Sequence, residues 1–350
     1  MKDKIQNRIT INGYLKENNL EERTGKDNTP VIRGTFTVAF DALDSIRVDV
    51  YCAQYTASGK ENKAYSAVAA LLPANTMSIK NLLEADGSAT FDTVKNAATK
   101  IVAYAEFRER AWTDEKTHTE VSRVQYTLCN YFNSIHVPSS TDDKFEPGAS
   151  FVADIYIESI RPEMGKTPDG EMDETGRLIV TGLIPDFKGM MQRVTFVTEA
   201  GGVSEYVGDN WRAGESTYVT GMYHNLKVVT EKPSEQAGFG QAAGERTVTT
   251  FVEERVIRGG GQSSVDANED GLAASGFTAD DVREGLQARA EAIQKSNEAR
   301  ATRGAANAGA TNTTAAAPKT AAKNFGFGDA VASGNAAPKA APGGFDPNAF

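Results

Sequence analysis

Arginine and tyrosine residues are interleaved along several short segments in the first third of this chain. They are Tyr14, Arg33, Arg47, Tyr51, Tyr55, Tyr104, Arg108 and Arg110, and Trp112 follows directly. Aromatic rings stack on other flat rings, and a guanidinium group binds carboxylates or phosphates through paired hydrogen bonds. These residue types therefore indicate a surface for an anionic ligand that carries flat rings.

A second and sparser set of the same residue types lies between residues 149 and 260. Its members are Tyr156, Arg177, Arg193, Trp211 and Tyr218. The segment 161–176 carries five carboxylates and two cations, so it would repel an anionic ligand. We therefore predict that the first set binds more tightly, and that the second set assists or contacts protein.

The distribution of charge fits this asymmetry. The chain has 37 basic and 47 acidic residues, a net charge of −10. Residues 1–100 hold 13 basic and 12 acidic groups, whereas residues 101–300 hold 20 basic and 33 acidic groups. The total argues against an indiscriminate binder of duplex DNA, which would be basic overall. It does not argue against a basic groove on an acidic protein.

The sequence contains few residues that could form a metal site, hold a cofactor or catalyse a reaction. Two cysteines, Cys52 and Cys129, and three histidines predict neither a metal site nor a cofactor. The stretch at 266–271 resembles the start of an EF-hand loop, but Phe277 stands where a bidentate glutamate is required. No nucleophile motif is present, so we expect no enzyme. No apolar run predicts a membrane span or a secretory signal, so we expect a cytoplasmic protein.

Most of these candidate binding residues lie on segments in which apolar and polar residues alternate, as they do in β-strands. Along 46–55, for example, Ile46, Val48 and Val50 fall on one face, and Arg47 and Tyr51 on the other. Strands are predicted at 8–15, 31–40, 46–55, 100–110 and 120–132, and again at 151–160, 177–184, 191–198, 216–228 and 246–257. Helical sequence fills 64–83, with a break at Pro73. Long polar loops are predicted at 16–30, 111–119, 161–176 and 229–245.

The chain then changes character toward its C-terminal end. Thr278 and Asp281 form a helix start signal, and Gly304 is a fitting stop, so we predict a helix over 278–304. Residues 305–350 are rich in Ala, Gly, Asn and Thr and are predicted to be disordered. The predicted organisation is a first domain at 1–137, a linker at 138–148, a second domain at 149–260, the helix and the tail.

Five strands with an insertion after the third and long loops after the first and fourth, repeated twice, resemble two OB-fold barrels. With a flexible tail ending in Phe, the chain resembles single-stranded DNA-binding proteins, particularly bacteriophage replication proteins. The resemblance implies a mainly β fold of two five-stranded Greek-key barrels with DNA across the sheet face. It also implies that the tail recruits replication, recombination or repair proteins through Phe345, Asp346, Pro347 and Phe350. Bacterial members end in an acidic tip with a terminal Pro-Phe, whereas this tip is GGFDPNAF.

The leading hypothesis is a sequence-nonspecific single-stranded DNA-binding protein that coats and protects DNA in phage replication or recombination. Stacking and phosphate contacts are the forces that such binding uses. A second hypothesis is a structural or adaptor protein whose barrels bind protein. A third is an RNA-binding regulator, because stacking hardly senses the 2′-hydroxyl group.

Overall fold

The computed structural model describes residues 5–25, 27–114, 116–131, 133–138, 145–166, 169, 171–186, 188–233, 245–264 and 277–310. The predicted linker residues 139–144, the EF-hand-like stretch and the tail from residue 311 lie outside them, and so do the four tail residues named above. Within the described residues the fold is mainly β. The chain up to Ala301 forms one compact unit, and a second unit begins at Thr302.

The first half of the compact unit contains a ring of paired strands. Its members are β1 (Asn7–Asn18), β3 (Pro30–Ala39), β4 (Ser45–Ala53), β5 (Lys100–Thr113) and β6 (Glu120–Leu128). Neighbouring strands pair antiparallel from β1 to β3 to β4, and from β6 to β5 and back to β1. A short parallel pairing of β4 with β6 closes the ring. The predicted strands of this half are therefore present, because alternate side chains such as Ile101, Ala103 and Phe107 enter the core.

Two short strands and four short helical segments complete this half. Strand β2 (Glu21–Thr24) pairs with β3, and β7 (Ile135–His136) pairs with β5. Between β4 and β5 lie α1 (Tyr65–Ala69), the 3₁₀ turn η1 (Pro73–Asn75), α2 (Ile79–Ala85) and α3 (Phe91–Val94). Pro73 breaks the helical sequence as predicted, since its ring cannot continue the preceding helix. Neither β2 nor β7 was predicted, because one is wholly polar and exposed and the other has two residues.

The second half repeats the same order of pairing. It comprises β8 (Gly148–Lys166), β9 (Met172–Pro185), β10 (Met191–Thr198), β11 (Ser216–Pro233) and β12 (Glu245–Gly260), with α4 (Gly202–Asn210) after β10. Antiparallel pairs link β8 to β9 to β10, and β12 to β11 and back to β8, while β10 and β12 pair in parallel. The segment 161–176 was predicted to be a loop, but β8 and β9 extend into it as a hairpin. Strand β11 likewise extends into the loop predicted at 229–245.

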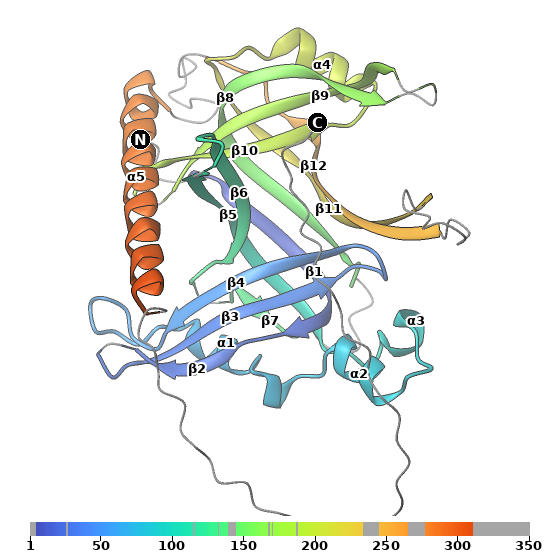
Figure 1. Ribbon diagram of the computed structural model, residues 1–350, viewed down its shortest axis with the longest axis vertical. Helices are drawn as coiled ribbons and strands as arrows, with labels where there is room; N and C mark the ends of the chain where they lie inside the picture. Colours follow the sequence, from blue (N-terminus) through green and yellow to red (C-terminus); the bar gives the residue numbers. More distant parts are fainter. Residues whose placement is uncertain are drawn as a thin grey trace, which may run out of the picture. The chain divides into compact units, whose positions relative to one another are not determined.

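The two halves share one sheet (Figure 1). They also share one hydrophobic core. Strand β1 pairs antiparallel with β8 from Asn7 opposite Ala153 to Asn12 opposite Gly148. Phe107 of the first half packs with its ring centroid 5.9 Å from that of Phe151 and 5.8 Å from that of Phe196. These contacts join the halves without an intervening solvent layer.

Helix α5 (Ala279–Ala310) follows the second half. Thr278 Oγ1 accepts a hydrogen bond from Asp281 N at 3.1 Å, so the predicted start signal is confirmed. The helix does not stop at Gly304 as predicted, because a glycine costs a helix only about 1 kcal/mol and its neighbours are mostly alanines. Phe277, Val282 and Leu286 pack on the second half, in a cluster with Leu183 and Met191. No helix among the described residues is both long enough and apolar enough to span a membrane.

Candidate functional site

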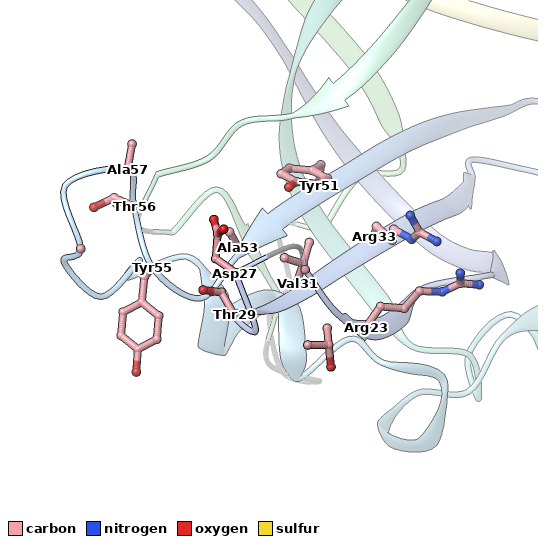
Figure 2. A pocket seen from close by; sticks show the side chains of 13 residues that line it. Arg23, Asp27, Thr29, Val31, Arg33, Tyr51, Ala53, Tyr55, Thr56 and Ala57 are labelled. Atoms are coloured by element: carbon pink, nitrogen blue, oxygen red, sulfur yellow. The ribbon is translucent and has the colours of Figure 1, made fainter.

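A groove of about 970 Å³ opens over β2, β3 and β4 (Figure 2). Its lining residues are Arg23, Thr24, Gly25, Asp27, Thr29, Val31, Arg33, Tyr51, Ala53, Tyr55, Thr56, Ala57 and Gly59. Three of the residues predicted from the sequence, Arg33, Tyr51 and Tyr55, therefore lie in one concave surface. The structure adds Arg23 to them from the short strand β2.

The pairing of β3 with β4 positions these side chains. Arg33 and Tyr51 are directly opposite each other in the ladder, so their side chains project from the same face. Val48, Val50 and Cys52 point into the core, which leaves Tyr51 66% exposed. Tyr55 is 47% exposed and lies at the opposite end of the groove from Arg23 and Arg33 (Figure 2). Two exposed aromatic rings and two cations thus share one groove.

The bend that places β2 beside β3 depends on a glycine. Gly34 has a φ of +134°, a conformation that L side chains rarely adopt. A Cβ atom at this position would lie 2.1 Å from the carbonyl oxygen of Asn19. The close approach brings the two chain segments together directly beside Arg33.

Both arginines of the groove contact a single carboxylate. Arg23 lies 2.5 Å from Glu21, and Arg33 lies 3.5 Å from it. The hydrogen bond from Arg23 lowers the pKa of Glu21. All three side chains are about half exposed, and exposed ion pairs of this kind contribute little stability. The guanidinium groups can therefore exchange this partner for a phosphate at small cost.

Arg47 and Arg110 lie together beyond the groove, where a smaller cavity also receives Arg123. Arg110 and Arg123 are directly opposite in the β5–β6 ladder. Sequence reasoning missed Arg123, although it alternates with Gln125 on a predicted strand. It also missed Arg23, which occupies a segment that was predicted to be a loop.

Two predicted contact residues are buried, which corrects their assignment to an open face. Tyr14 is 8% exposed and packs edge-on against Phe91 and Phe145. Trp211 is 2% exposed, and its Nε1 donates to the carbonyl oxygen of Gly261 at 2.8 Å. For Tyr14, alternation along the strand identifies two faces but does not show which one the inserted helices cover. Trp211 lies on no strand, because it is the C-cap residue of α4, and its ring turns into the core.

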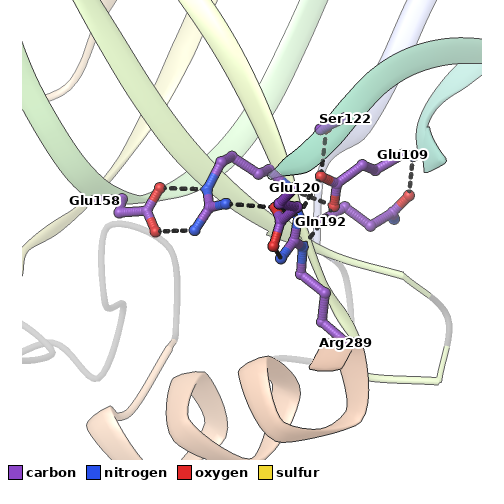
Figure 3. Close-up of polar contacts among 7 residues, drawn as sticks. Glu109, Glu120, Ser122, Glu158, Gln192 and Arg289 are labelled. Carbon is purple, nitrogen blue, oxygen red and sulfur yellow. Dashed lines mark hydrogen bonds and ion pairs between the residues drawn. The ribbon is translucent and has the colours of Figure 1, made fainter. Parts of the chain in front are cut away.

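Three other predicted arginines are engaged by carboxylates. Arg193 pairs with Glu158 at 2.5 Å and with Glu120 at 2.9 Å (Figure 3). Arg177 donates two hydrogen bonds to Glu254, at 3.0 and 3.2 Å. Arg108 lies 2.5 Å from Glu106. These side chains are only 22–33% exposed, so the ion pairs leave little charge for a ligand.

The four remaining aromatic residues differ in exposure. Tyr218 is 42% exposed, whereas Tyr104 stacks on Tyr131 at 6.4 Å between ring centroids. Tyr156 packs against the cluster under α5. Trp112 is half-buried, and the Arg300 guanidinium of α5 lies 4.6 Å from the centroid of its ring. The predicted set is therefore dispersed, and the concave surface that combines exposed tyrosines with arginines lies on the first half.

Comparison with known proteins gives one family and several solved structures, among them two of one single-stranded DNA binding protein. A family model described as YorF matches residues 6–299. The wild-type single-stranded DNA binding protein from Thermus aquaticus has a TM-score of 0.40 and 11% identity, over 75% of this chain and 95% of that one. A deletion mutant of the same protein has a TM-score of 0.39 and 9% identity, over 77% and 100%. No curated protein matches the sequence.

Proposed function

The chain belongs to the YorF family, and we propose that it binds single-stranded DNA along the groove over β2, β3 and β4. The observation that carries the proposal is the pairing of two exposed tyrosine rings with two half-exposed arginines in one concave surface. Stacking of a base on an aromatic ring contributes about 1–3 kcal/mol and tolerates any sequence. Cations beside the rings bind phosphates, which every strand carries.

We also propose that each half is an OB-fold barrel. The order of pairing supports this assignment, because in each half the first strand pairs with the second and fourth, and the third pairs in parallel with the fifth. Five-stranded Greek-key barrels of this kind bind nucleic acid across the second and third strands. Those strands in the first half are β3 and β4, which carry Arg33 and Tyr51.

We propose that the two halves contribute unequally to binding, because carboxylates neutralise the arginines of the second half. Arg177 and Arg193 of the second half are paired with glutamates, while Arg33 and Arg47 of the first half remain about half exposed or more. The first half therefore supplies the main affinity. The second half assists or contacts protein.

In this proposal the protein coats and protects exposed strands during phage DNA replication, recombination or repair in the host cytoplasm, without catalysing a reaction. Its tail, through Phe345, Asp346, Pro347 and Phe350, recruits partner proteins. The sequence of the tail supports this role, because aromatic residues follow each copy of its short AAPK repeat. Deletion of residues 343–350 is expected to leave the affinity for DNA unchanged while binding of replication proteins from the same phage is lost.

Titration of oligo(dT) against the full chain, followed by fluorescence anisotropy, tests the groove. We expect Tyr51→Ala to weaken binding about 5-fold to 150-fold, the equivalent of one lost stack. Tyr206→Ala is the matched control, because Tyr206 is 43% exposed on α4 and lies outside the groove. Equal affinities for wild type, Tyr51→Ala and Tyr206→Ala would overturn the proposal. A parallel titration with oligo(U) separates DNA binding from RNA binding.

A further inference from the structure

Three arginines from three different strands surround the cavity of about 270 Å³ beyond the groove. Arg47 comes from β4, Arg110 from β5 and Arg123 from β6. The opposite wall belongs to the second half and contains Tyr223, Asn225 and Glu253. The cavity therefore lies where the first ring of strands meets the ribbon of β11 and β12.

These arginines have an excess of positive charge around them. Asp49 is the carboxylate that they share, at 3.9 Å from Arg47. Glu253 is already occupied, since it accepts a hydrogen bond from Tyr126 Oη at 2.5 Å and pairs with Arg255. Among the described side chains, neither Arg110 nor Arg123 has a carboxylate within 4.0 Å.

Such an arrangement costs the folded chain free energy. Arg110 and Arg123 are directly opposite in the ladder, and like charges in that position are destabilising. Elsewhere on the same protein, Arg177, Arg193 and Arg289 each have glutamate partners. An anion that binds between the three arginines would remove the repulsion, and the cavity is open to receive one.

The cavity and the proposed groove both lie along β4. Tyr51 lines the groove and Arg47 lines the cavity, on the same face of the strand and about 13 Å apart at the usual rise per residue. On its other side, the cavity shares Arg123 and Glu253 with a third hollow that reaches Arg193 and Arg255 of the second half. A strand leaving the groove therefore meets the arginines before it reaches the second half.

We propose that Arg47, Arg110 and Arg123 bind the phosphates of a single strand that leaves the groove, and direct it across the junction toward β11 and β12. This inference rests on the proposed function and deepens it by making the site bipartite. Bases stack in the tyrosine groove, and backbone phosphates beyond it bind the arginine cluster. Short strands use the groove alone, whereas longer strands use both parts.

Strand length gives the decisive experiment. The triple variant Arg47→Gln, Arg110→Gln and Arg123→Gln is titrated with two oligo(dT) strands. One has about 5 nucleotides, close to the smallest site size of a single barrel, and the other about 20 nucleotides, more than the largest. We expect its affinity for the short strand to stay within about twofold of wild type. Its affinity for the long strand is expected to fall about 10-fold to 100-fold. The salt slope of long-strand binding should fall by about 2, because each lost phosphate contact removes about 0.7.

The control is Arg283→Gln, which removes one exposed cation of α5 outside both parts of the site. It should bind both strands as wild type does. If the triple variant fails to fold, as judged by circular dichroism, the single variant Arg123→Gln replaces it with a smaller expected loss of the same kind. A loss that is equal for both strands, or no loss for the long strand, would overturn the inference.

Two further outcomes distinguish a failure of the inference from a failure of the proposed function. If wild type binds neither strand, the proposed function fails together with the inference. If the short strand binds but the long strand gains nothing, only the inference fails. The last measurement uses inorganic phosphate. Suppose that phosphate raises the melting temperature of wild type but not of the triple variant, and that the triple variant binds the long strand as wild type does. The cluster would then bind a free anion, and its role in binding the strand would be overturned.

Discussion

Asp49 lies between the two positive parts of the proposed binding surface. Its side chain is on β4 between Arg47 and Tyr51, and it is 33% exposed. Burial raises its pKa, although the neighbouring arginines act in the opposite direction. A phosphate that passes from the groove to the cluster would be repelled by this carboxylate. The residue therefore limits how tightly a strand is held.

We expect Asp49→Asn to increase the affinity for a long oligo(dT) strand about 3-fold to 10-fold at low salt, with a smaller gain at high salt where charges are screened. Glu84→Gln, an exposed position on α2, is the control. Because the pKa of Asp49 is raised, it loses its charge at a higher pH than an ordinary aspartate does. Wild-type binding should accordingly strengthen on acidification more than binding by Asp49→Asn. Weaker binding by Asp49→Asn would contradict this account.

Among single residues, the sequence predicted the exposed residues of the groove better than it predicted the arginines that form ion pairs. Arg33, Tyr51 and Tyr55 could be predicted because alternation on β3 and β4 is regular and one face is apolar. Arg177 and Arg193 have the same local pattern, but their glutamate partners come from strands 35 to 77 residues away. One sequence contains no signal for such distant pairing, so a binding residue and a structural residue look alike.

Helix α5 is attached to the strands by a buried ion pair. The Arg289 side chain is 8% exposed and lies 2.6 Å from Glu109 and 2.5 Å from Glu120. Burial would raise the pKa of Glu109, but hydrogen bonds from Arg289, Ser122 and the Arg193 backbone outweigh burial and lower it. Stability from a depressed carboxyl pKa is complete above the unfolded value of about 4.3 and is lost as pH falls through the folded pKa.

We expect Arg289→Met to destabilise the protein by about 3–5 kcal/mol at neutral pH, because it leaves Glu109 charged and buried without its partner. The double variant Arg289→Met, Glu109→Gln should recover part of the lost free energy of unfolding. Urea unfolding at several pH values measures both. The exposed Arg283→Met variant should have no effect. A loss below about 1 kcal/mol in Arg289→Met would show that α5 is held by its apolar contacts instead.

Elements with a buried face could be predicted, and elements exposed on both faces could not. All ten long strands were expected, because each places alternate residues in the core. The hairpin of β8 and β9 beyond Pro162 has exposed residues such as Met164 and Met172 on both arms, so it has no alternation and resembles a polar loop. The narrow apolar stripe of α5 likewise gave no sign of Arg289, whose partners lie 169 and 180 residues away.

Over the whole molecule, most acidic residues lie outside the segment that forms the proposed groove. The net charge of −10 arises after residue 100, where carboxylates pair with Arg177, Arg193 and Arg289. The groove residues lie in the nearly neutral first hundred residues. The acidic part therefore neutralises these three arginines, and exposed positive charge remains on β2, β3 and β4 and at Arg110 and Arg123. Under the proposed function, this arrangement would allow a protein of negative net charge to attract a strand to one place.

The sequence predicts two domains, and the shared core raises the question of whether they unfold independently. The cooperativity of unfolding tests this. Phe107, Phe151 and Phe196 pack together from both halves, β1 pairs with β8, and the Asn225 backbone donates to Asp44 at 2.8 Å. Elements that share a core and a ladder unfold together when neither part is stable without the other. We therefore expect both halves to unfold in a single transition.

The two tryptophans report on one half each, since Trp112 is on β5 and Trp211 follows α4. In the chain labelled with 5-fluorotryptophan, their ¹⁹F resonances should lose intensity at the same urea concentration. Phe196→Ala, which empties part of the shared core, should lower both midpoints equally, by an amount equivalent to about 3–5 kcal/mol. If the Trp211 resonance shifted its midpoint while that of Trp112 kept its own, the halves would be independent domains, and the strand would cross a flexible junction rather than a fixed one.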